Sequence, residues 1–298
     1  MSQTSTSSLT SRLRLALHAG VSLLLLGAVV LLLHPQRYWE ILRSISMSSL
    51  LIAVGMAVAG FLVRAVRWHF LATQGVPLLT WAETVRSTVM GCRTAPLGNA
   101  WQARIESAEA LNGENRLGLG GLALLDVMLD ALVAVIAVAL NVFGLNALAV
   151  VGFLLALFLS LIEHVRRMQW TTQGILQRIA RALAKTSVAD VLIALLLSAL
   201  IYGCALLQFH FLLVSCGAGR LDLATKAGPV VFLVSYVPVG IFRLGLPQIA
   251  AAATLSSSGR AAEGVVTSLL FFLLNHALPR LIACAMAGAR ASGTKEEA

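Results

Sequence analysis

Several apolar stretches, each long enough to cross a lipid bilayer as a helix, constrain this 298-residue chain more than any other feature. A helix needs about 20 mostly apolar residues to cross the hydrocarbon core. Hydrophobic residues make up 58% of the chain and charged residues 12%, which is about half the charged share of a soluble domain. So few polar side chains cannot cover a soluble globule, and disorder requires low hydrophobicity. The sequence therefore predicts an all-α polytopic membrane protein, with residues 1–298 forming a single integral membrane domain.

The charges between the apolar stretches predict their orientation. The net charge is +9, and its cations lie between apolar runs, so we attribute them to cytoplasmic loops and expect no nucleic-acid partner. The linker 163–187 is the most basic loop. It predicts an amphipathic helix on anionic inner-leaflet lipids, with a solvated loop as the alternative. The tails 1–14 and 289–298 are expected to be cytoplasmic too. The six predicted spans are 15–33, 48–71, 117–143, 147–162, 189–215 and 265–288.

Two further segments contain helix breakers and are predicted to be re-entrant. Segment 81–98 ends in Pro-Leu-Gly, and segment 228–258 is interrupted by Pro238, Gly240, Gly245 and Pro247. The predicted orientation places both flanks of the first segment inside. It places both flanks of the second segment, 217–227 and 259–264, outside. Each segment must then enter and leave on one face, which is tolerated only where protein or water surrounds the backbone.

This arrangement predicts an inverted repeat. Residues 15–143 and 147–288 each contain two spans, a re-entrant element and a third span, and the two halves begin on opposite faces. Inverted repeats with interrupted helices are typical of transporters, and the interruptions indicate the substrate site. The alternative is eight complete spans with two proline kinks.

Asp126 and Asp130 lie four residues apart in the predicted span 117–143 and so share one helix face. A carboxylate inside the bilayer is costly unless it is paired or hydrated. The two aspartates therefore predict a polar cavity, a partner arginine or a proton site. The alternative is a structural ion pair with Arg93 or Arg104.

Arginines near the helix breakers are candidate ligands for a lipid head group. Arg243 follows the breakers of the second re-entrant element. There it can present a bidentate fork to a phosphate, or it pairs with Asp126 or Asp130. Arg93 and Arg104 flank the first break and have the same two interpretations.

Arg280 lies in the last predicted span, ten residues before Arg290. That spacing places it about 15 Å from the inner end of the helix. It either snorkels to the surface or lines a cavity with Asn275 and His276.

Short stretches of the chain combine arginine, proline, glycine and aspartate in a recognisable pattern. The stretches are Arg64-Ala65-Val66-Arg67-Trp68, Ala95-Pro96-Leu97-Gly98-Asn99, Leu124-Leu125-Asp126-Val127-Met128-Leu129-Asp130, Val237-Pro238-Val239-Gly240 and Leu244-Gly245-Leu246-Pro247-Gln248. They resemble the transmembrane region of the lysylphosphatidylglycerol synthases, a flippase-like family that includes stand-alone hopanoid-transport proteins. The resemblance covers about residues 10–290.

The chain departs from the family pattern at three positions. Asn99 and Gln248 stand where the family usually has glutamate, and Gln102 stands where it has arginine. These differences predict a divergent member, either with a different substrate or without transport activity. The resemblance nevertheless implies that Asn99 and Gln248 belong to the substrate site.

The leading functional hypothesis is flippase-type transport of a polar or isoprenoid lipid across the bacterial cytoplasmic membrane. The alternative is a non-transporting accessory that docks a lipid-modifying or glycosyltransferase enzyme. No nucleotide, hydrolase or metal motif is present in the sequence, and the soluble aminoacyl-transfer domain of the synthases is missing, so we expect neither enzymatic activity nor a cofactor. The expected partners are a lipid with a polar or phosphate head group and, under the alternative, a lipid-synthesis enzyme. The candidate substrate-binding residues are Arg93, Asn99, Arg104, Asp126, Asp130, Arg243, Gln248 and Arg280.

Overall fold

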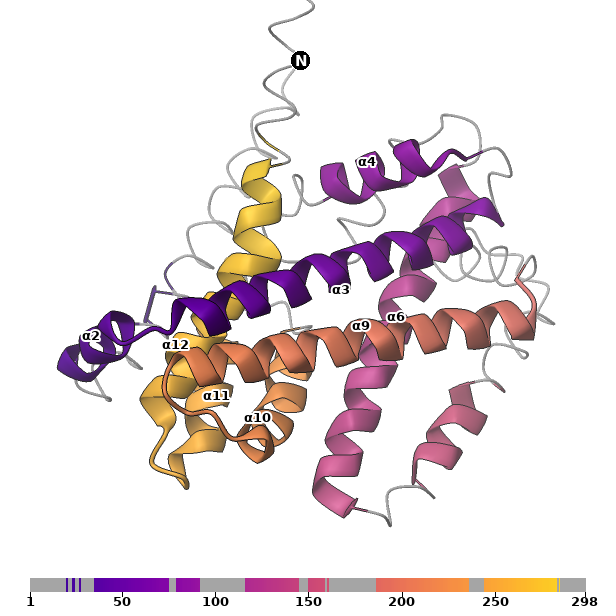
Figure 1. Ribbon diagram of the computed structural model, residues 1–298. Helices are drawn as coiled ribbons and strands as arrows, with labels where there is room; N and C mark the ends of the chain where they lie inside the picture. Colours follow the sequence, from indigo (N-terminus) through magenta and orange to yellow (C-terminus); the bar gives the residue numbers. More distant parts are fainter. Residues whose placement is uncertain are drawn as a thin grey trace, which may run out of the picture. The chain divides into compact units, whose positions relative to one another are not determined.

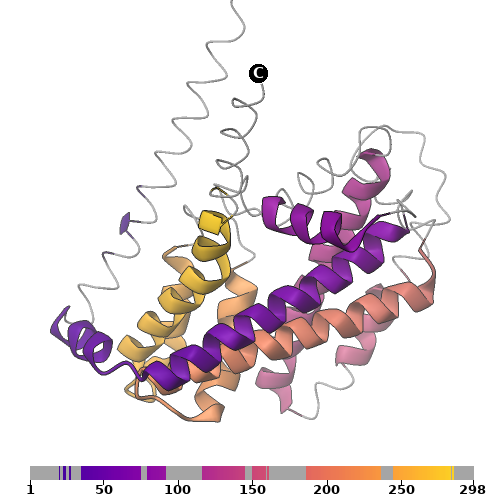
Figure 2. The ribbon, with the colours of Figure 1, turned by 45° about the horizontal axis from the view of Figure 1, so that its top comes forward.

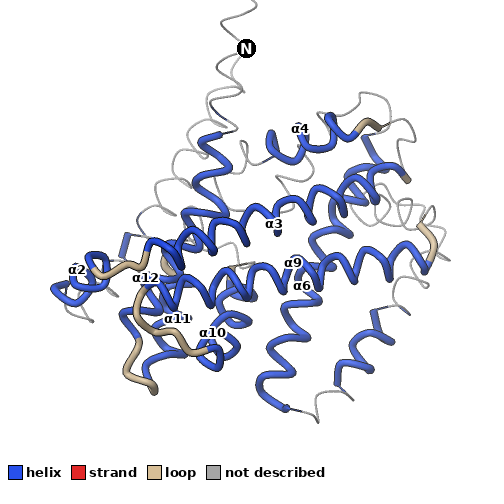
Figure 3. Tube along the Cα trace, viewed as in Figure 1, coloured by secondary structure: helices blue, strands red, loops and turns tan. Residues whose placement is uncertain are grey.

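Helices make up all the regular structure that can be described. The computed structural model describes residues 35–74, 79–91, 116–144, 150–158, 186–235 and 244–282, with isolated positions at 20, 23, 24, 27, 160 and 284. Within these residues there is no β-strand, as Figure 3 shows, and the prediction of an all-α protein is confirmed there. The helices are α2 (Pro35–Arg43), α3 (Met47–Thr73), α4 (Trp81–Gly91), α6 (Arg116–Phe143), α9 (Val188–Ser215), α10 (Leu221–Val234), α11 (Leu246–Ser256), α12 (Ala261–Phe272) and the π-helix η3 (Leu273–Ala277).

Four described helices are long and apolar enough to cross a membrane. They confirm the predicted spans 48–71, 117–143 and 189–215 to within a few residues, because each is an uninterrupted apolar run. The fourth overlaps the prediction 265–288 but begins four residues earlier, and it contains the unpredicted π-helix. The four are Met47–Thr73, Gly121–Phe143, Val188–Ser215 and Ala261–Ile282.

Two predicted spans and one predicted linker are only partly described. Nearly all of 15–33 lies outside the described residues. Residues 150–158 of the span 147–162 are helical. Only the last two residues of the linker 163–187 are described. The six-span arrangement therefore stays a prediction.

Two helices begin with reciprocal caps, which explains where they start. The Thr80 amide donates to Glu83 Oε2 at 2.9 Å, and the Glu83 amide donates back to Thr80 Oγ1 at 3.3 Å. The Ser187 amide likewise donates to Asp190 Oδ2 at 2.9 Å, and the Asp190 amide donates to Ser187 Oγ at 3.1 Å. These pairs satisfy amides that the first helical turn leaves without partners, at the start of α4 and of α9.

The chain divides into two compact units. The first unit contains α2, α10, α11 and α12 with the adjoining ends of α3 and α9. The second unit contains the remainder of α3 and α9 together with α4 and α6. Because α3 and α9 are continuous, each contributes one end to each unit (Figure 1).

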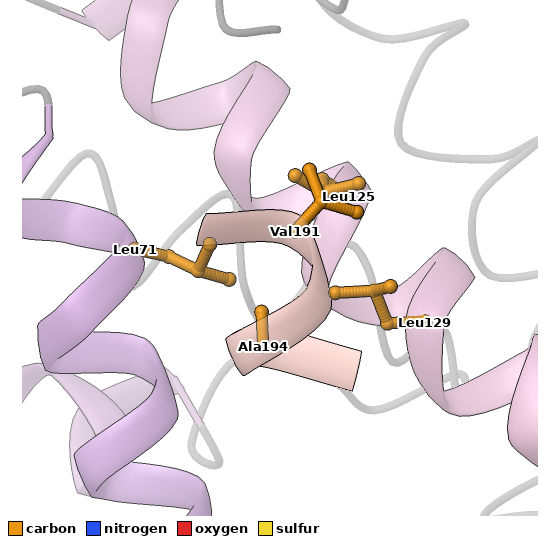
Figure 4. Close-up of a cluster of buried hydrophobic side chains, with 5 residues drawn as sticks. All are labelled: Leu71, Leu125, Leu129, Val191 and Ala194. Atoms are coloured by element: carbon orange, nitrogen blue, oxygen red, sulfur yellow. The ribbon is translucent and has the colours of Figure 1, made fainter. Parts of the chain in front are cut away.

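In the second unit α3 and α9 run side by side in opposite directions (Figures 1 and 2). Gly60 allows a close approach, because a Cβ there would lie 3.4 Å from the Cβ of Cys204. Further along, α6 joins the pair through a buried apolar cluster (Figure 4). The cluster fixes three helices against one another beside the candidate site; its members are Leu71 of α3, Leu125 and Leu129 of α6, and Val191 and Ala194 of α9.

In the first unit α11 packs between α10 and α12. Helix α10 has 14 residues and α11 has 11, so they are about 21 and 16 Å long, and each is too short for a hydrocarbon core of about 30 Å. The predicted re-entrant segment 228–258 thus covers the end of α10 and all of α11. Its first helix begins at Leu221, seven residues earlier than the segment. Its central break, 236–243, lies outside the described residues.

Three connections lie together at one end of the first unit. The Ser46 amide donates to the Ser215 carbonyl at 3.1 Å, which joins the start of α3 to the end of α9. Arg37 Nη2 donates to the Gly259 carbonyl at 3.1 Å, which joins α2 to the turn between α11 and α12. The predicted orientation, which places these connections on the outer face, stays a prediction.

Candidate functional site

Arg67 is wholly buried inside the second unit. It lies on α3, six residues before the helix ends at Thr73, which is about 9 Å along the axis. Its side chain has no solvent exposure. A buried guanidinium must have its charge compensated nearby, and the neighbouring helices α6 and α9 provide the groups that do so.

Two aspartates of α6 and one serine of α9 surround the guanidinium. Arg67 Nε lies 2.6 Å from Asp126 Oδ1, and Nη2 donates to Asp130 Oδ2 at 3.0 Å. Nη1 donates to both Asp130 Oδ1 and Ser198 Oγ. We call these four residues the Arg67 cluster. The prediction that Asp126 and Asp130 share a helix face is confirmed, because both contact the same guanidinium.

Exposure differs within the Arg67 cluster. The side chains of Arg67 and Asp126 are 0% exposed, whereas that of Asp130 is 13% exposed. Asp130 is therefore the more accessible of the two aspartates that contact the guanidinium.

The next turn of α3 binds α4 through polar side chains. Trp68 Nε1 donates to Ser87 Oγ at 3.2 Å, and His69 Nδ1 lies 2.7 Å from Thr84 Oγ1. Trp68, Thr84 and Ser87 are buried. Helix α4, the described part of the predicted re-entrant segment 81–98, is thus attached directly beside the Arg67 cluster.

Gln248 lies in the first unit, at the beginning of α11. Its side chain is wholly buried, and its Oε1 accepts a 2.6 Å hydrogen bond from the Gly245 amide. Gly245 has φ of +103°, a conformation that only glycine adopts readily, so the turn before α11 is specific. Gln248 Nε2 has no hydrogen-bond partner in the part of the chain that the structure describes. Gln248, a predicted substrate-binding residue, thus caps α11 with its amide oxygen. Its amide nitrogen has donors that no described residue accepts.

The remaining predicted site residues are less informative. Arg280 is half-buried on the helical turn that follows the π-helix, and the π-helix itself contains Asn275 and His276. A π-helix within a longer helix is frequent at functional sites. Four predicted site residues lie outside the described residues: Arg93, Asn99, Arg104 and Arg243.

Arg67 and Ser198 were not predicted from the sequence as members of the site. Arg67 was named only within the stretch Arg64–Trp68, and the expected partners of the aspartates were Arg93, Arg104 and Arg243. A signal was nevertheless present, because Arg67 lies within the apolar run 48–71, and an arginine at that depth needs an acidic partner. Ser198 had no comparable signal, since small polar residues occur throughout membrane helices.

No protein-family model matches the chain, and no curated protein matches its sequence. The functional interpretation therefore depends on the residues themselves.

Proposed function

We propose that this protein is a flippase-type transporter that moves a lipid with a polar or phosphate head group across a membrane. The observation that carries the proposal is the Arg67 cluster, in which a fully buried arginine is held between two aspartates of a neighbouring apolar helix. The resemblance to the transmembrane region of the lysylphosphatidylglycerol synthases agrees with this function. Part of that resemblance lies in the segments that contain Arg67, Asp126 and Asp130.

A buried ion cluster needs a functional explanation because it is an inefficient way to stabilise a fold. Removing charges from water costs several kcal/mol per ion, and apolar residues of similar volume are often equally or more stabilising. Helices α3, α6 and α9 already contact one another through the apolar cluster around Leu71 and Leu129. Function is therefore the stronger reason for three charged side chains within candidate spans.

The proposed mechanism is an exchange of partners on the guanidinium. Arg67 presents Nη1 and Nη2 to Asp130 as a planar fork, and a phosphate oxygen pair fits the same fork. The head group displaces Asp130, the more exposed aspartate, while Asp126 holds Nε in place. The lipid tail stays in the bilayer, so only the polar group enters the protein.

The finer topology belongs to this proposal. It comprises six spans and two oppositely oriented re-entrant elements, with both termini cytoplasmic, in a bacterial inner membrane. The short helices α10 and α11, which end and begin on either side of the predicted break, support a re-entrant element there. Arg93, Asn99, Arg104, Arg243, Gln248 and Arg280 remain candidate substrate residues.

A triple replacement separates function from stability. Arg67→Met with Asp126→Leu and Asp130→Leu removes all three charges and keeps an apolar core, so we expect it to fold. In liposomes containing a short-chain fluorescent phospholipid, the wild type should move the lipid between leaflets, measured by dithionite quenching. The triple variant should be inactive. A triple variant as active as the wild type would rule out the proposed role of the cluster.

The second candidate function is a non-transporting accessory that docks a lipid-modifying or glycosyltransferase enzyme. The observation that favours it is the complete burial and pairing of Arg67 and Asp126, because paired charges in a filled core are also expected of a scaffold. Under this function the wild type does not move the fluorescent lipid, and affinity purification from the native membrane recovers an enzyme. The enzyme should be recovered equally with the triple variant.

A further inference from the structure

Helix α2 presents three different faces. The first is turned toward the protein, with Ile41 buried and Tyr38 packed against the same small cluster of Cys216, Ala262 and Val266. Burial raises the pKa of the Tyr38 hydroxyl, which agrees with this packing. The face is thus an ordinary part of the first unit.

Ion pairing fixes the same face of α2 to the start of α12. Arg37 Nη2 lies 3.4 Å from Glu263 Oε1 and 3.1 Å from the Gly259 carbonyl oxygen. Arg260 Nη1 donates to the same Glu263 oxygen at 2.9 Å. Glu263 is only 4% exposed, so its charge needs both arginines. Helix α2 therefore has a fixed rotation about its own axis.

That rotation leaves a second, apolar face exposed. Trp39 is 58% exposed and Leu42 is 46% exposed, and the two are three residues apart, so they lie on one side of the helix. The guanidinium carbon of Arg43 lies 5.0 Å from the centre of the Trp39 ring. The third face is polar and exposed, with Gln36 and Glu40.

A candidate membrane span follows α2 in the chain and also begins with exposed apolar residues. Helix α3 begins four residues after α2 ends, and its first turns expose Met47 and Leu51 at 65% and 64%. Tryptophan and arginine are the residues that suit the head-group region, where an apolar body meets a polar tip. A helix with one protein face, one apolar face and one polar face has the pattern of an element lying in the membrane interface.

We propose that α2 is an interfacial helix that inserts Trp39 and Leu42 among phospholipid head groups and places Arg43 against their phosphates. The occupant of this face is the phospholipid layer itself. The Arg37–Glu263 ion pair sets the rotation that exposes this face. The inference is independent of transport, because it concerns how the first unit contacts the bilayer.

Photo-crosslinking at two neighbouring positions tests the proposal. Benzoylphenylalanine replaces Trp39 in one full-length variant and Glu40 in another, and both are placed in vesicles of phosphatidylethanolamine and radiolabelled phosphatidylglycerol. The two positions are exposed on the same helix but point about 100° apart. We expect lipid adducts at position 39 to exceed those at position 40 severalfold. Equal adducts, or adducts of position 39 with a second copy of the chain in place of lipid, would overturn the proposal.

A second experiment tests whether the Arg37–Glu263 ion pair sets the rotation of α2. Arg37→Ala in the position-39 variant removes the contact to Glu263, so lipid adducts should decrease and adducts at position 40 should increase. Arg43→Ala leaves the ion pair intact and should preserve the preference for position 39. An unchanged ratio in the Arg37→Ala background would show that the ion pair does not orient α2.

Discussion

Arg67 Nε lies 2.6 Å from Asp126 Oδ1, and neither side chain has any solvent exposure. The two residues come from different candidate spans, α3 and α6, so the contact is a tertiary one between helices. Arg67 also contacts Asp130 and Ser198, so this one guanidinium joins α3 to both α6 and α9.

Replacing Arg67 should destabilise the protein strongly. Arg67→Ala leaves a buried aspartate without this cation, and such a loss costs ~3–5 kcal/mol. The stability of Arg67→Lys should be intermediate. An ammonium keeps the charge but cannot replace all the contacts that Nε, Nη1 and Nη2 of Arg67 make. Unfolding in mild detergent by added denaturant measures both. Arg64→Ala is the matched control, one helical turn away and half-buried, and its stability should stay close to that of the wild type.

Substitution of Asp126 should mainly reduce stability, whereas substitution of Asp130 should mainly reduce transport. Asp126→Asn should lower the folded yield more than Asp130→Asn, because Asp126 is 0% exposed and Asp130 is 13% exposed. Asp130→Asn should accumulate normally and lose lipid translocation, since it alters the group that the head group displaces. The measurements are yield after size-exclusion chromatography and dithionite-based translocation. Reduced yield of Asp130→Asn with full specific activity would contradict the proposed function.

Gly264 should be intolerant of a side chain. A Cβ at this position would lie 3.0 Å from both the Ala251 carbonyl oxygen and Leu255 Cδ1, so Gly264→Ala should push α12 from α11 at a cost of ~1–3 kcal/mol. Gly203→Ala is the matched control, because nothing lies within 4 Å of its Cβ position. It should be neutral or stabilising by ~0.5–1 kcal/mol, since glycine weakens a helix interior. Thermal unfolding of the two variants provides the comparison.

The spans were predictable and the partners of the charged residues were not. Runs such as Met47–Thr73 and Val188–Ser215 contain enough apolar residues to define a helix by themselves, and the cap pair Ser187 and Asp190 marks one start. The contact between Arg67 and the aspartates depends on which helices are neighbours and on their relative rotation. The hydrophobic periodicity of a single helix says nothing about its neighbours or its rotation against them. Several arginines were therefore equally good candidates for the partner of the aspartates.

The π-helix Leu273–Ala277 was not predicted, although the sequence carries a marker for it. Pro279 follows it by two residues, and a proline inside a helix removes an amide donor and disturbs the hydrogen bonds of the preceding turn. The bounds of the second predicted re-entrant element were set by its helix breakers, so its start at residue 228 falls inside α10, which begins at Leu221. Pro229 lies inside α10, so a proline marked the interior of this helix and not its end.

The cap of α4 should make its stability pH-dependent. Hydrogen bonds from the Thr80 amide and hydroxyl hold the pKa of Glu83 below its ordinary value. Because the folded pKa is lowered, this contribution is present above the unfolded pKa of glutamate and is lost as the pH falls through the folded value. Hydrogen exchange of α4 should therefore accelerate under acid conditions, after correction for the intrinsic rate. Thr80→Ala should remove this dependence, while Ser87→Ala, which removes a hydroxyl that donates to the Thr84 carbonyl, should preserve it.

The connections at the two ends of the helices should be accessible from opposite sides of the membrane. In the first unit, the hydrogen bond between Ser46 and Ser215 joins the α2–α3 connection to the end of α9. The hydrogen bond between Arg37 and Gly259 joins α2 to the turn between α11 and α12. Ser44→Cys and Ser258→Cys should thus react with an impermeant maleimide from the same side.

Gln74 follows the last residue of α3, and Ala189 is near the first residue of α9. Both are therefore at the helix ends far from Ser46 and Ser215. The same reagent should label Gln74→Cys and Ala189→Cys from the other side of the membrane. The background has its four native cysteines replaced, and normal chromatographic behaviour of that background is the control. Labelling of positions 44 and 258 from opposite faces would contradict the contacts of the first unit. Labelling of all four positions from one face would contradict the membrane-spanning assignment of α3 and α9. The predicted orientation places positions 44 and 258 outside and positions 74 and 189 in the cytoplasm, because the basic linker 163–187 immediately precedes α9.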